Sequence, residues 1–310
     1  MKKTATALTV LAAICLLTLA ASASAVYQTL PFSQDWTNTG LITATNNWSG
    51  VPGIEGFGGT IASGTYSSSG GNPQGILDDA LFNDPLSPPA VWVIANVTGA
   101  PSGENSGGVY EFQGTSNPNP SVGMQGSGTA DAPFLKLYLN TTGKQNIRVQ
   151  YDLRDIDCQS TATAQLFALH YRVGTSGLWT NVAAGYVANA AGTSGGQCTQ
   201  VTHVDVTLPA AANNVSQLQV RVMTCNASGS DEMIGVDNIS ITGADIPPPT
   251  GACCLRAGAQ GACVMATAGE CAAMLPQPGI FLGVGVPCDP GVCATPAAKA
   301  SWGQVKTIYR

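Results

Sequence analysis

The sequence has few charged side chains, and this scarcity excludes several functions. Charged residues make up 10% of the 310 residues, with 12 Lys and Arg against 18 Asp and Glu and a formal net charge of -6. Binding to nucleic acid needs a basic patch that neutralises phosphates, so we expect no nucleic-acid partner. The chain has only two histidines, which argues against a multi-histidine metal site and against histidine-based catalysis.

Long apolar runs are also scarce, and the clearest one lies at the N-terminus. Two N-terminal lysines, the apolar run 8–20 and the small-residue site 23–25 predict a secretory signal peptide over residues 1–25. Its removal would leave a chain that begins at Val26. No later segment reaches the roughly 18 apolar residues that a transmembrane helix needs. We therefore expect an extracytoplasmic protein, either secreted or held at the cell surface, without a transmembrane segment.

Glycine and proline are abundant, at 37 and 19 residues. This composition disfavours helices and favours short strands joined by turns. Apolar and polar residues alternate in the runs 135–139, 147–154, 204–208 and 218–222, and turn residues bound each run. Such alternation gives a strand one buried face and one wet face, which predicts an all-β fold. We expect a jelly-roll β-sandwich over residues 26–243.

A proline-rich linker is predicted over residues 244–251, because consecutive prolines hold an extended spacer. The following stretch, 252–294, is too short to bury an adequate apolar core, and an even number of cysteines in an exported chain predicts disulfides. A zinc knuckle is the competing interpretation, but the stretch contains no histidine. The six cysteines of this disulfide-rich module are Cys253, Cys254, Cys263, Cys271, Cys288 and Cys293, and their connectivity stays open.

The sandwich itself contains three cysteines, Cys158, Cys198 and Cys225, which cannot all pair with one another. Cys158 and Cys225 each follow an alternating strand, so we favour a disulfide between them. Cys198 would then be free or would join a second chain, which makes an oligomer a further expectation.

Acidic residues surround one alternating strand near the end of the sandwich. Asp231 and Glu232 precede it and Asp237 lies within it, and Asp35 could join them if the first and last strands are neighbours. Carboxylate oxygens are the ligands that calcium prefers, so we predict a structural calcium ion there. In the competing interpretation these acids cap turns and solvate an edge strand.

Tryptophan offers candidate glycan-binding platforms, because an indole face can stack on the apolar face of a sugar ring. Trp48 and Trp179 are our candidates, although tryptophan in a sandwich is more often part of the core. A hydrolase could use a pair of carboxylates across a cleft, and Asp152, Asp155 and Asp157 are the candidates for that role.

Several motifs of the sandwich resemble a known family. The runs 151–157, 169–174 and 206–211 and the closing run 235–239, Gly-Val-Asp-Asn-Ile, resemble a jelly-roll module of secreted bacterial proteins. That module accompanies extracellular domains of the endonuclease/exonuclease/phosphatase class, and the closing run is also similar to the end of MAM and other lectin-like sandwiches. The resemblance covers about 100 residues. It implies a jelly roll, supports calcium at Asp237 and carries no catalytic residues.

The C-terminal part carries two further resemblances. Residues 251–293 resemble a short cysteine-rich repeat near the C-termini of secreted bacterial proteins, and residues 302–310 resemble a terminal Trp-Gly-x-x-Lys-x-x-Tyr-Arg signature. We expect the tail, 295–310, to be a sorting or attachment peptide read by a receptor; the competing interpretation is a frayed end.

Three functions follow from these features, in decreasing order of support. The first is a non-catalytic secreted or cell-surface binding or adhesion protein that recognises a glycan or envelope polymer. The second is a structural component of an extracellular matrix or coat. The third is an extracellular hydrolase or an accessory domain of one.

Overall fold

The computed structural model describes residues 25–61, 66, 69–83, 91–98, 107–113, 119–157, 163–192, 199–255 and 262–293. Residues 1–24 of the predicted signal peptide, Cys158, Cys198 and the predicted tail therefore lie outside the described residues. The chain divides into two compact units between Asp245 and Ile246. In the described part of the chain, no helix is long and apolar enough to cross a membrane.

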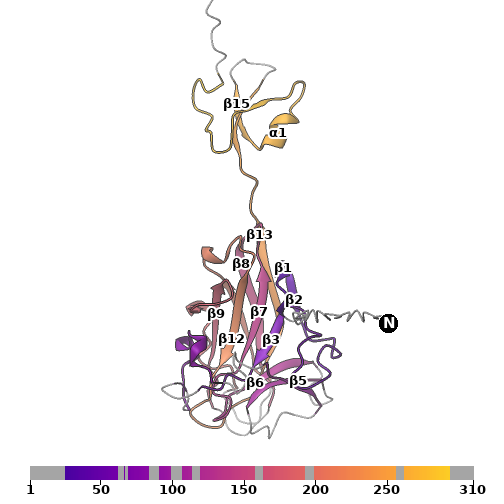
Figure 1. Ribbon diagram of the computed structural model, residues 1–310, viewed down its shortest axis with the longest axis vertical. Helices are drawn as coiled ribbons and strands as arrows, with labels where there is room; N and C mark the ends of the chain where they lie inside the picture. The colour runs from indigo at the N-terminus through magenta and orange to yellow at the C-terminus, as the bar shows by residue number, and fades with distance from the viewer. Residues whose placement is uncertain are drawn as a thin grey trace, which may run out of the picture. The chain divides into compact units, whose positions relative to one another are not determined.

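The first unit is a β-sandwich of two sheets (Figure 1). The larger sheet has seven strands in the order β11-β8-β13-β6-β5-β4, and β2 also pairs with β13. Its strands are β2 (Phe32–Gln34), β4 (Ile94–Val97), β5 (Gly108–Phe112), β6 (Ser121–Gln125), β8 (Lys144–Asp155), β11 (Val201–Thr207) and β13 (Ile234–Asp245).

The second sheet of the sandwich has six strands in the order β1-β7-β12-β9-β10, and β3 also pairs with β7. β7 and β12 lie side by side in antiparallel register, as do β12 and β9. The strands are β1 (Gln28–Thr29), β3 (Ile54–Phe57), β7 (Phe134–Asn140), β9 (Phe167–Val173), β10 (Thr180–Asn181) and β12 (Leu218–Thr224). Short 3-10 helices lie in the connections: η2 (Pro73–Gly75), η3 (Asp79–Leu81), η4 (Ala183–Gly185) and η5 (Ala210–Ala212).

The alternating runs form the strands that they predicted, and their apolar positions meet between the two sheets. Leu135, Leu137 and Leu139 of β7 are 0–1% exposed, and they share one core cluster with Val149 and Leu153 of β8. Burial of each such side chain contributes about 1.5–3 kcal/mol. The all-β sandwich predicted from period-two alternation is therefore confirmed.

The second and the last strand of the sandwich, β2 and β13, are neighbours. A register shift in β13 lies between Asp237 and Ser240, and Asn238 there has a φ of 49°. β6 pairs with β13 before this bulge and β2 pairs with it after the bulge, where Gln34 lies opposite Ile239. Asp35 consequently comes next to the strand that carries Asp237.

The second unit is a small sheet with one helix, stabilised by disulfides. Its strands are β14 (Gly251–Cys254), β15 (Cys263–Ala266) and β16 (Ile280–Phe281), with β14 in the centre. The helix α1 (Ala268–Ala272) begins with a capping box, in which Thr267 and Glu270 bond to each other's backbone amides. β13 runs on to Asp245 and β14 begins at Gly251, so strand residues occupy both ends of the predicted linker.

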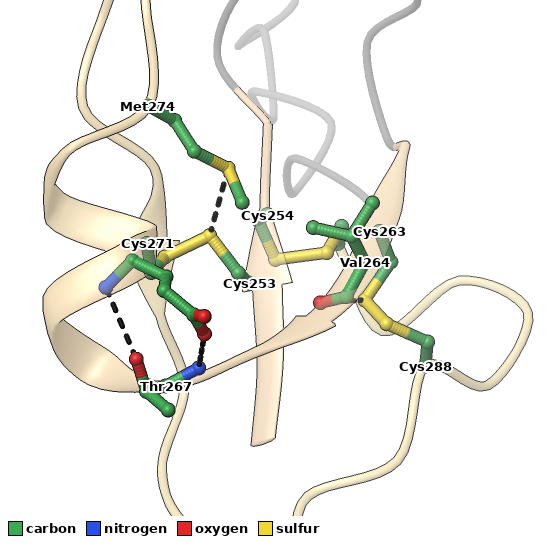
Figure 2. Close-up of a disulfide and its surroundings, with 10 residues drawn as sticks. Cys253, Cys254, Cys263, Val264, Thr267, Cys271, Met274 and Cys288 are labelled. Carbon is green, nitrogen blue, oxygen red and sulfur yellow. Dashed lines mark hydrogen bonds between the residues drawn. A yellow bond between two sulfur atoms is a disulfide. The ribbon is translucent and has the colours of Figure 1, made fainter. Parts of the chain in front are cut away.

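The six cysteines of this unit form three disulfides: Cys253–Cys271, Cys254–Cys293 and Cys263–Cys288. Figure 2 shows Cys253 of β14 bonded to Cys271 of the helix, with Met274 beside them. The apolar cluster is small, since its buried members are Cys253, Ala266 and Cys271. Disulfides replace the core that so short a segment cannot build.

Reduction of the three disulfides should unfold the second unit and leave the sandwich folded. Each disulfide stabilises by about 2–4 kcal/mol, and the only cysteine of the first unit among the described residues is a free thiol, Cys225. Scanning calorimetry of the full chain should then show one transition lost in reductant and one retained. A single thermal transition that shifts as a whole in reductant would contradict the prediction that the two units unfold independently.

Candidate functional site

The outer face of the six-stranded sheet, turned away from the sandwich core, carries an unusual set of polar side chains. Seven of them occupy the positions of β3, β7, β9 and β12 that alternate with the core residues, and three lie outside these strands. In register across the strands, Tyr138 lies opposite Gln219, and Gln219 lies opposite Arg172. The next row of cross-strand neighbours is Glu55, Lys136, Arg221 and His170. We call the following set the outer-face network: Tyr27, Glu55, Asp79, Lys136, Tyr138, His170, Arg172, Trp179, Gln219 and Arg221.

Asp79 is the central acceptor of this network. It lies at the start of η3, and its Oδ2 accepts from Arg172 Nη1 at 2.6 Å. Its Oδ1 accepts from Trp179 Nε1 at 2.7 Å and from Arg221 Nη1 at 3.4 Å. One carboxylate thus binds two guanidinium groups and an indole, and it holds the segment 73–82 over the sheet.

Trp179 is enclosed by the same two arginines. The Cζ atoms of Arg172 and Arg221 lie 4.3 Å and 4.4 Å from its ring, a cation–π arrangement with both guanidinium groups. The side chain is 2% exposed. It therefore presents no ring face to a ligand, and the prediction of an exposed glycan platform at Trp179 is wrong.

Arg221 is completely buried, so its guanidinium charge must be stabilised by neighbouring acceptors instead of water. Its Nη2 donates to the carbonyl of Ile76, and its Nε donates to His170 Nδ1 at 3.1 Å. Burial, followed by the neighbouring Arg221, lowers the pKa of His170 to about 3, which keeps the imidazole neutral. A neutral ring can accept a hydrogen bond from the guanidinium N–H at Nδ1, whereas a protonated ring has no free acceptor and would repel the guanidinium charge.

Tyr27 and Lys136 are partly open to solvent, and we call them, with four buried side chains connected to them, the open half: Tyr27, Glu55, Lys136, Tyr138, Gln219 and Arg172. Gln219 accepts from Arg172 Nε at 2.7 Å and donates to the Tyr27 hydroxyl at 3.0 Å. Tyr27 also packs edge-on against Tyr138, with ring centroids 5.6 Å apart. Tyr138 in turn donates to Glu55 Oε2 at 2.6 Å. Tyr27 and Lys136 are partly exposed, while the other four residues are buried.

Lys136 lies among these groups with its ammonium over aromatic rings. Its Nζ is 4.4 Å from the Phe57 ring centroid and 5.3 Å from that of Tyr138. Desolvation by burial lowers the pKa of Lys136 to about 8, and Glu55 and Asp79 oppose that shift. The open half therefore combines aromatic rings, an amide, a carboxylate and a cation on a rigid sheet.

The outer face of the seven-stranded sheet is different, because exposed polar pairs cover part of it. His203 contacts Asp152 at 2.7 Å, and Asn238 donates to the other oxygen of Asp152 at 2.8 Å. Arg148 and Asp205 form a similar pair across β8 and β11. These residues are solvated surface groups whose partners are all protein side chains.

The four residues predicted to bind calcium do not converge. Asp35 is exposed and accepts from Thr37, and Asp231 accepts from the backbone amide of Ala227. Asp237 is buried against Arg154 at 3.0 Å. In the part of the chain that the structure describes, no three acidic, histidine or cysteine side chains form a group that could hold a metal ion.

Glu232 instead lies among other acidic groups. It is 2% exposed, and burial followed by the neighbouring Asp157 raises its pKa to about 8. Asp157 is also buried and accepts from the amide of Met233 at 2.8 Å, and Asp155 accepts from that of Gly192 at 2.7 Å. Asp152 faces outward on β8, whereas Asp155, three residues further along, points to the other face and is buried. The three aspartates considered for a hydrolase therefore do not share one open cleft.

Two further predictions are corrected by burial and bonding. Trp48 is 2% exposed and donates to the carbonyl of Trp92, and Gly56 makes room for its ring, since a Cβ there would lie 2.5 Å from the indole. It is a core residue and not a glycan platform.

Cys225 is a buried free thiol, so the predicted Cys158–Cys225 disulfide is wrong.

The sequence analysis missed the outer-face network, although a signal was present. In β7, β9 and β12 the positions between core residues hold Lys136, His170 and Arg221, and aromatic residues accompany them. Alternation alone assigns such positions to solvent. Only the pairing of β3, β7, β12 and β9 brings them together under η2 and η3.

The fold and this network define a mostly β, two-sheet sandwich with a polar outer face. No family model and no curated protein sequence matches the chain.

Three solved structures are similar to part of the chain. A non-crystalline cellulose specific carbohydrate-binding module, CBM28, is 17% identical and matches 48% of this chain and 86% of its own, with a TM-score of 0.32. TmCBM61, solved with β-1,4-galactotriose, is 9% identical and matches 41% of this chain and 72% of its own, with a TM-score of 0.27. The K1 cleaved adhesin domain of Lys-gingipain from Porphyromonas gingivalis W83 is 13% identical and matches 41% of this chain and 75% of its own, with a TM-score of 0.28. Similarity this distant assigns no function to the chain.

Substitution of Asp79 by Asn should destabilise the sandwich far more than the same change at Asp205. The two aspartates are alike in exposure, at 33% and 35%, but the arginines bound to Asp79 are 6% and 0% exposed whereas Arg148 is 50% exposed. We expect Asp79→Asn to lower the free energy of unfolding by about 2–3 kcal/mol, less than the loss of about 3–5 kcal/mol when a fully buried pair is broken. Asp205→Asn should lower it by about 0–1 kcal/mol. Urea denaturation of both variants tests this; equal losses would refute it.

Glu232 should make the sandwich less stable as the pH rises. Its pKa is near 4.5 when unperturbed and about 8 in the fold, so the folded state binds the extra proton between these values. The stabilisation is complete below about pH 4.5 and is lost as the pH rises through about 8. Glu232→Gln should therefore gain stability relative to the parent between pH 5 and pH 8 in urea denaturation. A parallel pH dependence in the two proteins would contradict the raised pKa.

Proposed function

We propose that this chain is a non-catalytic binding protein that recognises a glycan with the open half of its outer-face network. The observation that carries the proposal is that Tyr27 and Lys136 are partly exposed beside the buried ring of Tyr138. Gln219 bonds to Tyr27, and Glu55 bonds to Tyr138. Sugars present both hydroxyl groups and apolar ring faces, and this group of side chains offers hydrogen-bonding groups beside aromatic rings.

The rigidity of the side chains in the open half also favours binding. Gln219 already bonds to Arg172 and Tyr27, and Tyr138 already bonds to Glu55, so these side chains have few alternative rotamers. A ligand that meets ordered side chains loses less conformational entropy than one that must order them. A few fixed polar groups beside aromatic surface are typical of small-molecule sites.

The disulfides support an extracytoplasmic site of action. The second unit contains three of them, and disulfides persist in oxidising compartments outside the cytoplasm. Polysaccharides of the cell envelope and of the surroundings are available to a protein there.

Substitution of Tyr27 by Ala should weaken glycan binding with little effect on stability, since Tyr27 is partly exposed and lies at the edge of the network. The full chain would be tested by pull-down on insoluble polysaccharides and then by affinity electrophoresis on the polymers that retain it. We expect a loss of about 3- to 10-fold, the equivalent of an aromatic contact of 0.5–1.5 kcal/mol.

His203→Ala is the matched control, because His203 is exposed on the outer face of the other sheet. It should bind as the parent does. Retention of full affinity by Tyr27→Ala, with loss in His203→Ala, would place the binding surface on the seven-stranded sheet. Failure of the parent to bind any polymer would refute the proposed function.

A further inference from the structure

Lys136 is the charged group of the open half that lacks a close partner. Its neighbours in the network each hydrogen-bond to a named atom: Glu55 accepts from Tyr138, and Arg172 donates to Asp79 and Gln219. The Lys136 ammonium lies over the rings of Phe57 and Tyr138, and among the described residues the Lys136 side chain forms no ion pair or hydrogen bond. Its three ammonium protons are therefore free to bind an acceptor.

The position of Lys136 is also unfavourable for its charge. It lies directly opposite Arg221 in the register of β7 and β12, and like charges opposite each other destabilise a sheet. Arg172 also faces it, and both arginines oppose its protonation. Glu55 of β3, opposite Lys136, and Asp79 near η3 attract it. Three cations thus share two carboxylates, which leaves a local positive charge on a chain whose net charge is -6.

From this geometry, and building on the proposed glycan function, we infer that Lys136 binds an anionic group of the ligand. The ligand would be an acidic sugar, with a carboxylate or a sulfate ester on the ring. The anionic group would accept from Lys136 Nζ, while Tyr138 and Tyr27 lie beside the ring that carries it. A neutral glycan would leave the Lys136 ammonium without an acceptor, and desolvating an unpaired charge is costly.

The test compares three soluble polymers by affinity electrophoresis with the full chain: polygalacturonate, a sulfated galactan and neutral β-1,4-galactan. The parent should bind at least one acidic polymer more tightly than the neutral one. Lys136→Met should lose about 10- to 100-fold in affinity for that polymer, because a hydrogen bond to a charged group is worth about 1.5–3 kcal/mol. The carboxylated and sulfated polymers distinguish the two kinds of anionic group.

Lys144→Met is the matched control, since it removes the same charge from the seven-stranded sheet, where Lys144 pairs with Asp245. It should bind as the parent does, which separates a local effect from a change in net charge. Lys136→Met should also fold, because the change removes a cation opposite Arg221. Lys136→Arg keeps the charge and should retain most of the affinity, and thermal melts of all variants exclude unfolding as the cause.

The pH dependence gives a readout that a structural role would not produce. The pKa of Lys136 is about 8, so the affinity for the acidic polymer should begin to fall as the pH rises above about 8. Lys136→Arg should remove that dependence, since arginine stays charged.

Two outcomes overturn the inference and are distinguishable from one another. If the parent binds neutral galactan as well as the acidic polymers and Lys136→Met changes nothing, the glycan function stands and the role of Lys136 fails. If the parent binds none of the polymers, the proposed function itself fails.

Discussion

The sandwich depends on the neutralisation of two arginines on the outer face of one sheet. Arg172 and Arg221 are diagonal neighbours on β9 and β12 and are almost completely buried. Buried guanidinium groups are stable only with an anion and enough acceptors, and Asp79 supplies the anion to both. Because Asp79 comes from a segment far away in the sequence, the charge requirement determines that the residues around η2 and η3 cover this end of the sheet.

The same requirement explains why the sheet has a covered end and a partly open one. Asp79 reaches Arg221 and holds Trp179 at the covered end, where the apolar residues Phe57, Phe134 and Met223 form a second cluster outside the sandwich core. In the described part of the chain no carboxylate forms an ion pair with Lys136, and Lys136 stays partly exposed although the side chains around it are buried.

The two units solve the problem of stability in different ways. The sandwich buries long apolar strands between two sheets, with Leu137 and Val220 among the core residues. The second unit has a buried cluster of only three residues and relies on three disulfides. Short chains bury too small a fraction of their surface for a core to suffice, so cross-links that restrict the unfolded state take its place.

The sequence by itself determined the sandwich and the disulfide-rich module. Alternation such as Leu135, Leu137 and Leu139 is a local property of the chain, and cysteine density is visible without a structure. Only the tertiary structure decided how the cysteines pair, that Trp48 and Trp179 are buried, and that the predicted calcium ligands stay apart. It also decided the outer-face network, because β3, β7, β12 and β9 become neighbours through pairings between distant segments. Alternation in the sequence predicts which residues share one face of a strand. Which residues of different strands become neighbours depends on the strand order, which alternation does not predict.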